Sequence, residues 1–208
     1  MDISSSSKKI KRRCTVNTLV KISMLGAVAT VLMLFEIPLW FAPGFYKLDF
    51  SEVAVLIGGF ALGPVAGILI ELLKILLNLM FNSTQTAGIG EIANFIIGCS
   101  LVVPASLIYL KHKDKKHAII GIITGTLCMA TIGGLLNAYL LLPVYAKAFK
   151  MPMDALVAAG TAVNPAINSL SDFVLMAVTP FNIFKGIVVG LITVPIYKKL
   201  SPVIKGRC

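Results

Sequence analysis

The strongest constraint on the fold is a succession of long apolar segments that contain almost no charge. The segments cover about residues 16–35, 52–62, 65–81, 89–110, 118–142 and 172–197. Most of them have the roughly 20 residues that an α-helix needs to cross about 30 Å of bilayer hydrocarbon. Hydrophobic residues make up 57% of the chain and charged residues 13%, more apolar surface than a soluble domain of 208 residues can bury. We therefore predict an all-α integral membrane protein with a bundle of six transmembrane helices.

The basic residues predict the topology of this bundle. The chain has 19 Lys and Arg, and most of them cluster at residues 8–21, 111–116 and 198–207. If the chain starts in the cytoplasm and crosses six times, every cluster lies in the cytoplasm, as the positive-inside rule requires. We expect cytoplasmic termini and contact with bilayer headgroups, and no nucleic-acid partner. The expected domains are a basic tail at 1–15, one transmembrane domain at 16–200 and a basic tail at 201–208.

Three irregularities are expected within the bundle. The segment at 52–62 is too short to cross a bilayer and should pack inside the bundle, reached by an outer loop that dips inward. Pro180 should kink or break the last span, because proline lacks the N–H of a helical hydrogen bond. The outer connection between the last two spans should contain an interfacial helix near Met153–Val163.

The sequence carries no recognisable catalytic set. It contains no Gly-x-x-x-x-Gly-Lys-[Ser/Thr] phosphate loop, no His-Glu-x-x-His and no Gly-x-Ser-x-Gly, and its four cysteines form no Cys-x-x-Cys pair. We therefore expect no catalytic residue, no metal site and no catalytic cofactor. An intramembrane enzyme acting on lipid or isoprenoid stays an alternative, but its acids, at Glu36, Glu91 and Asp172, are widely dispersed in the sequence.

Three polar side chains fall in the outer halves of the last two predicted spans. Asn182 and Lys185 are three residues apart, so they share one helix face, and Asn137 lies at similar depth on the preceding span. A lysine in hydrocarbon must snorkel to the surface, pair with an acid or bind a ligand. A buried asparagine often only links two helices. The convergence of all three favours binding.

Further polar residues lie in the third and fourth spans. Asn78 and Asn94 can each link neighbouring helices. Glu71 and Lys74 are also three residues apart, so they can neutralise one another on one helix face. A structural role is at least as well supported as a functional one for each of these four residues.

The amide and lysine set indicates the chemistry of a ligand. An asparagine side chain offers a donor and an acceptor, which together match the C=O, N–H, C=O edge of an imide. A lysine can donate to a ring carbonyl or a hydroxyl. The spans contain no arginine, the residue that a phosphate would favour. The pattern is typical of a site for a neutral, flat, heterocyclic ligand.

Small residues on the first span form a separate signal. Ser23 and Ala27 are spaced four residues apart, as are Gly26 and Thr30. Small side chains at this spacing let a second helix approach closely. That second helix can belong to the bundle itself or to a partner protein.

Two long motifs resemble those of a known family. Lys47–Gly67, together with Glu71-Leu-Leu-Lys74, resembles the riboflavin-binding S component of energy-coupling factor (ECF) transporters. Pro180-Phe-Asn-Ile-Phe-Lys-Gly186 and Asn137 in Gly-Gly-Leu-Leu-Asn-Ala-Tyr are similar to that family too. The resemblance covers about residues 16–200.

The resemblance implies a function and a set of partners. S components are six-helix subunits of the prokaryotic plasma membrane that capture a vitamin from outside. They dock on a transmembrane coupling subunit that two cytoplasmic ATPases drive. Riboflavin would be the transported ligand and not a catalytic cofactor. An S component for another flat heterocyclic vitamin stays an alternative.

The resemblance also assigns residues. The positions that contact flavin in the resembling subunits match Asn137, Asn182 and Lys185 here. The loop between the first two spans covers the ligand, which adds Lys47, Leu48 and Asp49. Many S components dock through Ala-x-x-x-Ala on the first span. In this chain Ser23 replaces the first alanine and Ala27 keeps the second, while Gly26 and Thr30 form the adjacent small face.

Overall fold

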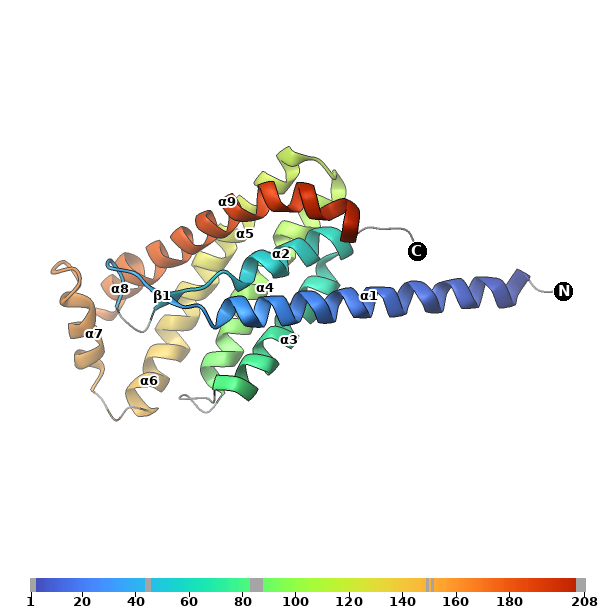
Figure 1. Ribbon diagram of the computed structural model, residues 1–208. Coiled ribbons are helices and arrows are strands. Elements are labelled where there is room, and N and C mark those ends of the chain that lie inside the picture. Colours follow the sequence, from blue (N-terminus) through green and yellow to red (C-terminus); the bar gives the residue numbers. More distant parts are fainter. Residues whose placement is uncertain (1–2, 44–45, 83–87, 149, 151, 205–208) are drawn as a thin grey trace.

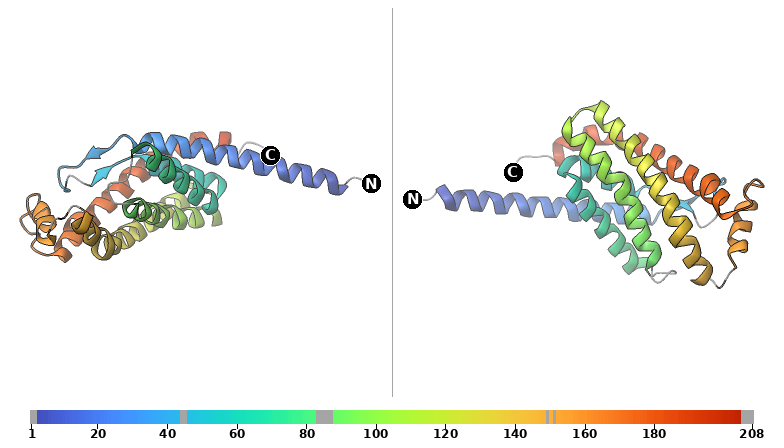
Figure 2. Two further views of the ribbon diagram at one scale, coloured as in Figure 1. Left: turned by 90° about the horizontal axis from the view of Figure 1, so that it is seen from below. Right: turned by 180° about the vertical axis from the view of Figure 1, so that it is seen from behind.

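The protein is a bundle of helices with a small hairpin at one end (Figures 1 and 2). The computed structural model describes residues 3–43, 46–82, 88–148, 150 and 152–204, with backbone only at 3–15, 148, 156 and 200–204. The elements are α1 (Ile3–Met33), β1 (Ile37–Pro38), β2 (Lys47–Leu48), α2 (Ser51–Leu62), α3 (Pro64–Asn82), α4 (Ile89–Lys111), α5 (Lys115–Leu136), η1 (Asn137–Leu141), α6 (Leu142–Ala148), α7 (Met153–Thr161), α8 (Leu170–Phe173), η2 (Val174–Val178) and α9 (Thr179–Ile204).

Within the part of the chain that the structure describes, five helical stretches are long and apolar enough to cross a membrane. They are Val16–Met33, Pro64–Asn82, Ile89–Lys111, Lys115–Lys147 and Leu170–Lys199. The chain is therefore a multi-pass membrane protein. The one predicted span missing from this set is the second, at residues 52–62. It corresponds to α2, which has 12 residues and a length of about 18 Å. All ten of its residues from Ser51 to Phe60 are buried, so this helix packs within the bundle, as its short apolar sequence predicts.

The core forms around α2. This helix contacts α1, α3, α4 and α9, and α4 packs closely on α5. A side-chain carbon at Gly125 would lie 2.3 Å from the backbone oxygen of Leu101, so glycine lets these two helices touch through their backbones. The rings of Phe60, Tyr109 and Tyr197 pack against one another near the ends of α2, α4 and α9, and Tyr197 donates a 2.9 Å hydrogen bond to Tyr109.

The last two spans each contain a π-helical segment. The first, η1, begins at Asn137 and continues into α6, so the helix of the fifth span extends past its predicted end near 142. The second, η2, ends immediately before Thr179-Pro180. The backbone N–H and the hydroxyl of Thr179 both donate to the oxygen of Val174, five residues earlier. The irregularity expected at Pro180 therefore lies in the preceding turn and is a widened helix.

Different elements of the chain lie at the two ends of the bundle. Both termini and the turn between α4 and α5 lie toward one end, and the hairpin, α6, α7 and α8 lie at the other (Figure 1). A helix, α7, covers Met153–Thr161 within the segment 153–163 where a helix was expected. The backbone of α1 is helical through residues 3–15, most of the predicted basic tail, and α9 continues to Ile204, beyond the expected boundary at 200.

Candidate functional site

A cavity of about 500 Å³ opens at the hairpin end of the bundle. Its wall comes from the ends of α1, α3, α4 and α9, from η1, and from the loop that leads into α2. Five of the six binding residues expected from the sequence line it, namely Lys47, Asp49, Asn137, Asn182 and Lys185. Asn78 and Asn94 line it too. Leu48 does not: its side chain is buried on the alternate face of β2.

Asn137 is the first residue of the π-helical segment η1 and is 2% exposed. Its amide nitrogen donates a 2.8 Å hydrogen bond to the backbone oxygen of Gly133. Its amide oxygen accepts a hydrogen bond from the hydroxyl of Tyr46, which comes from the loop above the cavity. Burial, together with the nearby Tyr145, raises the pKa of Tyr46 well above its ordinary value, so this phenol remains a donor.

Asn182 lies beside Gly133, where α5 and α9 are in contact. Its amide nitrogen donates to the backbone oxygen of Val178 at 3.1 Å. A side-chain carbon added at Gly133 would lie 2.8 Å from that same nitrogen. Glycine at 133 therefore makes the room that Asn182 occupies, and the two amides reach the same cavity wall.

Lys185 pairs with an acid and still lines the cavity. Its ammonium nitrogen lies 2.8 Å from Oδ2 of Asp49, in the loop before α2, and its side chain is 10% exposed. Snorkelling is therefore not its role. Burial would raise the pKa of Asp49, but the charges of Lys185 and Lys74 and hydrogen bonds from Lys185 and Ser51 outweigh it and hold that pKa well below its ordinary value.

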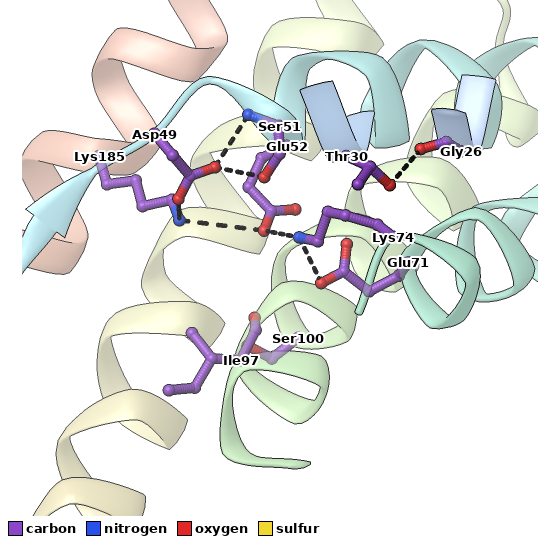
Figure 3. Close-up of polar contacts among 10 residues, drawn as sticks. All are labelled: Gly26, Thr30, Asp49, Ser51, Glu52, Glu71, Lys74, Ile97, Ser100 and Lys185. Carbon is purple, nitrogen blue, oxygen red and sulfur yellow. Dashed lines mark hydrogen bonds and ion pairs between the residues drawn. The ribbon is translucent and has the colours of Figure 1, made fainter. Parts of the chain in front are cut away.

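Behind Lys185 an ionic network continues into the core (Figure 3). The Glu71–Lys74 pair expected from the sequence is present, with Nζ and Oε1 2.7 Å apart. Lys74 also donates to Oε1 of Glu52 at 2.9 Å, and that oxygen lies 4.0 Å from Nζ of Lys185. Glu52 was not among the predicted site residues, and its signal in the sequence is a carboxylate at the start of an otherwise apolar helix.

Other residues of the cavity wall were not expected as ligand contacts. Tyr46, Tyr145 and Phe181 add aromatic surface, and Glu36 and Glu91 add carboxylates. Glu36 forms a 2.6 Å ion pair with Lys47 across the hairpin. Asp172, the third acid of the enzyme alternative, is half-buried on α8 and accepts a hydrogen bond from Ser169.

The two small faces of α1 lie in different surroundings. Ser23 and Ala27 are exposed on the outside of the bundle. Gly26 and Thr30 are buried, and a side-chain carbon at Gly26 would lie 2.5 Å from the side chain of Leu73 in α3. A partner helix would have to displace α3 to reach this second face, so its role is packing within the bundle.

Comparison with known proteins assigns the family. Residues 17–197 match the family model described as "ECF transporter, substrate-specific component". The chain belongs to this family. Its members are transporter subunits and not enzymes, in line with the missing catalytic set. Among the described residues, no group of three or more His, Cys, Asp or Glu could hold a metal ion.

Individual relatives cover almost the whole chain. The riboflavin transporter RibU of Staphylococcus aureus is 36% identical over 187 residues, which are 90% of this chain and 92% of that protein. The riboflavin transporter FmnP of Bacillus subtilis is 32% identical over 188 residues, 90% of this chain and 93% of that protein. A solved structure, described as the S component of a bacterial ECF transporter, has a TM-score of 0.71 and 34% identity, and covers 92% of this chain and 99% of that one.

Proposed function

We propose that this chain is a riboflavin-binding S component, which captures the vitamin at the outer face of the membrane for ATP-driven uptake by partner subunits. One observation carries the proposal. In a chain 36% identical to a riboflavin transporter, Asn137, Asn182 and Lys185 line a single cavity. Its volume of about 500 Å³ is in the usual range for small-molecule sites.

The cavity wall suggests how the flavin would lie. Asn137 and Asn182 would face the imide edge of the ring, and Lys185 would donate to a ring carbonyl. The loop that carries Lys47 and Asp49 would cover the ligand. Tyr46 and Phe181, whose ring centroids are 5.4 Å apart, supply apolar surface to the flat faces of the ring. Riboflavin is cargo in this proposal and not a cofactor.

The same proposal includes the topology and the partners. The chain would lie in a prokaryotic plasma membrane with both termini in the cytoplasm, and α2 would count as the sixth, embedded helix of the bundle. The clustering of basic residues near the termini and the α4–α5 turn supports this orientation. A transmembrane coupling subunit and two cytoplasmic ATPases would complete the transporter.

Fluorescence titration tests the ligand assignment. We expect the purified protein to quench riboflavin fluorescence with a dissociation constant below about 1 μM. Competition with a panel of other flat vitamins should leave riboflavin as the tightest ligand. Absence of quenching at tens of micromolar riboflavin, or a tighter ligand in the panel, would remove riboflavin from the proposal.

The exposed small face of α1 is the proposed docking surface for the coupling subunit. We expect Ala27→Trp to abolish riboflavin uptake and retention of the coupling subunit during purification, because a large ring prevents close approach of helices. Riboflavin affinity should not change. The matched control is Leu191→Trp at another exposed position, on α9. Equal loss of uptake in both variants would indicate a general membrane defect and contradict docking at Ala27.

A further inference from the structure

The buried network beside the cavity contains an odd number of charges. Its members are the acids Asp49, Glu52 and Glu71 and the bases Lys74 and Lys185. No side chain among them is more than 10% exposed. If all five were ionised, three carboxylates would face two ammonium groups, and one negative charge would be left over in the core.

Two of the carboxylates converge on one small space. A side-chain carbon placed at Gly98 of α4 would lie 2.2 Å from Oε1 of Glu71 and 3.1 Å from Oε1 of Glu52. Glycine at this position therefore leaves the room in which both carboxyl groups sit. The Oε2 atoms of Glu52 and Glu71 are buried and accept no hydrogen bond from the described residues.

The groups that face the two carboxyls do not compensate the extra charge. Lys74 lies between them, at 2.9 Å from Glu52 and 2.7 Å from Glu71. Lys185 is 4.0 Å from Glu52, but it is already paired with Asp49. Among the described residues, the thiol of Cys99 on α4 is a further titratable neighbour of the two carboxyls. An unpaired carboxylate in such surroundings is strongly unfavourable, and a buried acid avoids that cost by taking up a proton.

We propose that the Glu52–Glu71 pair is a proton-binding site, which holds one proton at neutral pH and makes the network neutral. The proton belongs on Glu71, because among the described residues Lys74 is the one ammonium group within 4 Å of it, whereas Glu52 faces both lysines. Because Glu52 lies 4.0 Å from Lys185, which lines the cavity, the protonation state of the pair sets the charge next to the cavity wall. The proposal concerns the empty protein and does not depend on which vitamin binds.

Infrared spectroscopy tests the site on the full-length, ligand-free protein. Wild type should show the C=O stretch of a protonated carboxylic acid, with the expected shift in D₂O. The band should vanish in Glu71→Gln, which keeps the shape and charge of the protonated acid. Asp172→Asn, at a half-buried acid on α8 outside the network, should leave it unchanged.

Glu52→Gln gives a second, independent test, which can be made even if Glu71→Gln does not fold. Removing either acid leaves two carboxylates for two lysines, so no proton is retained and the band should vanish in this variant too. A wild-type spectrum without the band overturns the proposal, as does a band that persists in both variants. If the band is absent and unfolding depends on Na⁺ concentration, a metal cation takes the place of the proton.

Discussion

Lys74→Met should destabilise the protein by about 3–5 kcal/mol, the cost of removing one partner from a buried ion pair. The ammonium group of Lys74 is 0% exposed and lies within 3 Å of an oxygen of both Glu52 and Glu71. Methionine has a similar length but no charge, so both carboxyls would lose their shared donor in the core. Thermal unfolding in detergent, followed by circular dichroism, measures the loss.

Two further variants decide whether the network causes this loss. Lys47→Met makes the same substitution in an exposed ion pair with Glu36, and it should cost less than about 1 kcal/mol. Adding Glu52→Gln to Lys74→Met removes a carboxylate along with the lysine and should recover much of the lost stability. If Lys74→Met unfolds at the same temperature as Lys47→Met, Lys74 is not an essential part of the core.

Asn182→Ala should weaken riboflavin binding tenfold to a hundredfold. The amide lines the cavity and is 5% exposed, and a hydrogen bond lost from such a site costs about 1–3 kcal/mol. Fluorescence titration gives the affinity. Asn168→Ala makes the same change outside the cavity wall, at an exposed position before α8, and should bind as wild type. Wild-type affinity in Asn182→Ala would restrict Asn182 to helix packing.

Lys185 has to be replaced together with Asp49, because removal of Lys185 alone would leave the buried carboxylate of Asp49 without its ion-pair partner. The double variant Lys185→Met/Asp49→Asn removes both charges of the 2.8 Å pair at once. Riboflavin affinity should fall at least as far as in Asn182→Ala, while the unfolding temperature should change far less than in Lys74→Met. A double variant that binds normally would show that Lys185 serves the ion pair alone.

Much of the architecture follows from local sequence patterns. The length and apolar content of five segments, the short buried helix α2 and a helix at the position of α7 all agree with the structure. The Glu71–Lys74 pair was predictable because residues three apart on a helix are neighbours. The π-helical segments were not, since no spacing in the sequence distinguishes a widened turn from a regular one.

The candidate site depended more on tertiary contacts. The sequence indicates Asn137, Asn182 and Lys185, because a polar side chain within an apolar span is energetically costly unless it pairs with another group or binds a ligand. It does not indicate Tyr46, which bonds Asn137 over 91 positions of separation. Nor does it show that Glu52 joins the network, since a carboxylate in the first turn of a helix is common at any helix start.

The sequence by itself determined the membrane class, the helical segments and which polar side chains lie within apolar segments. Only the tertiary structure decided which residues these side chains contact: Lys185 meets Asp49 from 136 positions away, and α3 covers Gly26 and Thr30 while Ser23 and Ala27 remain outside. The physical reason is that helical periodicity specifies which residues share a face. The partner of that face is selected by the packing of the whole bundle.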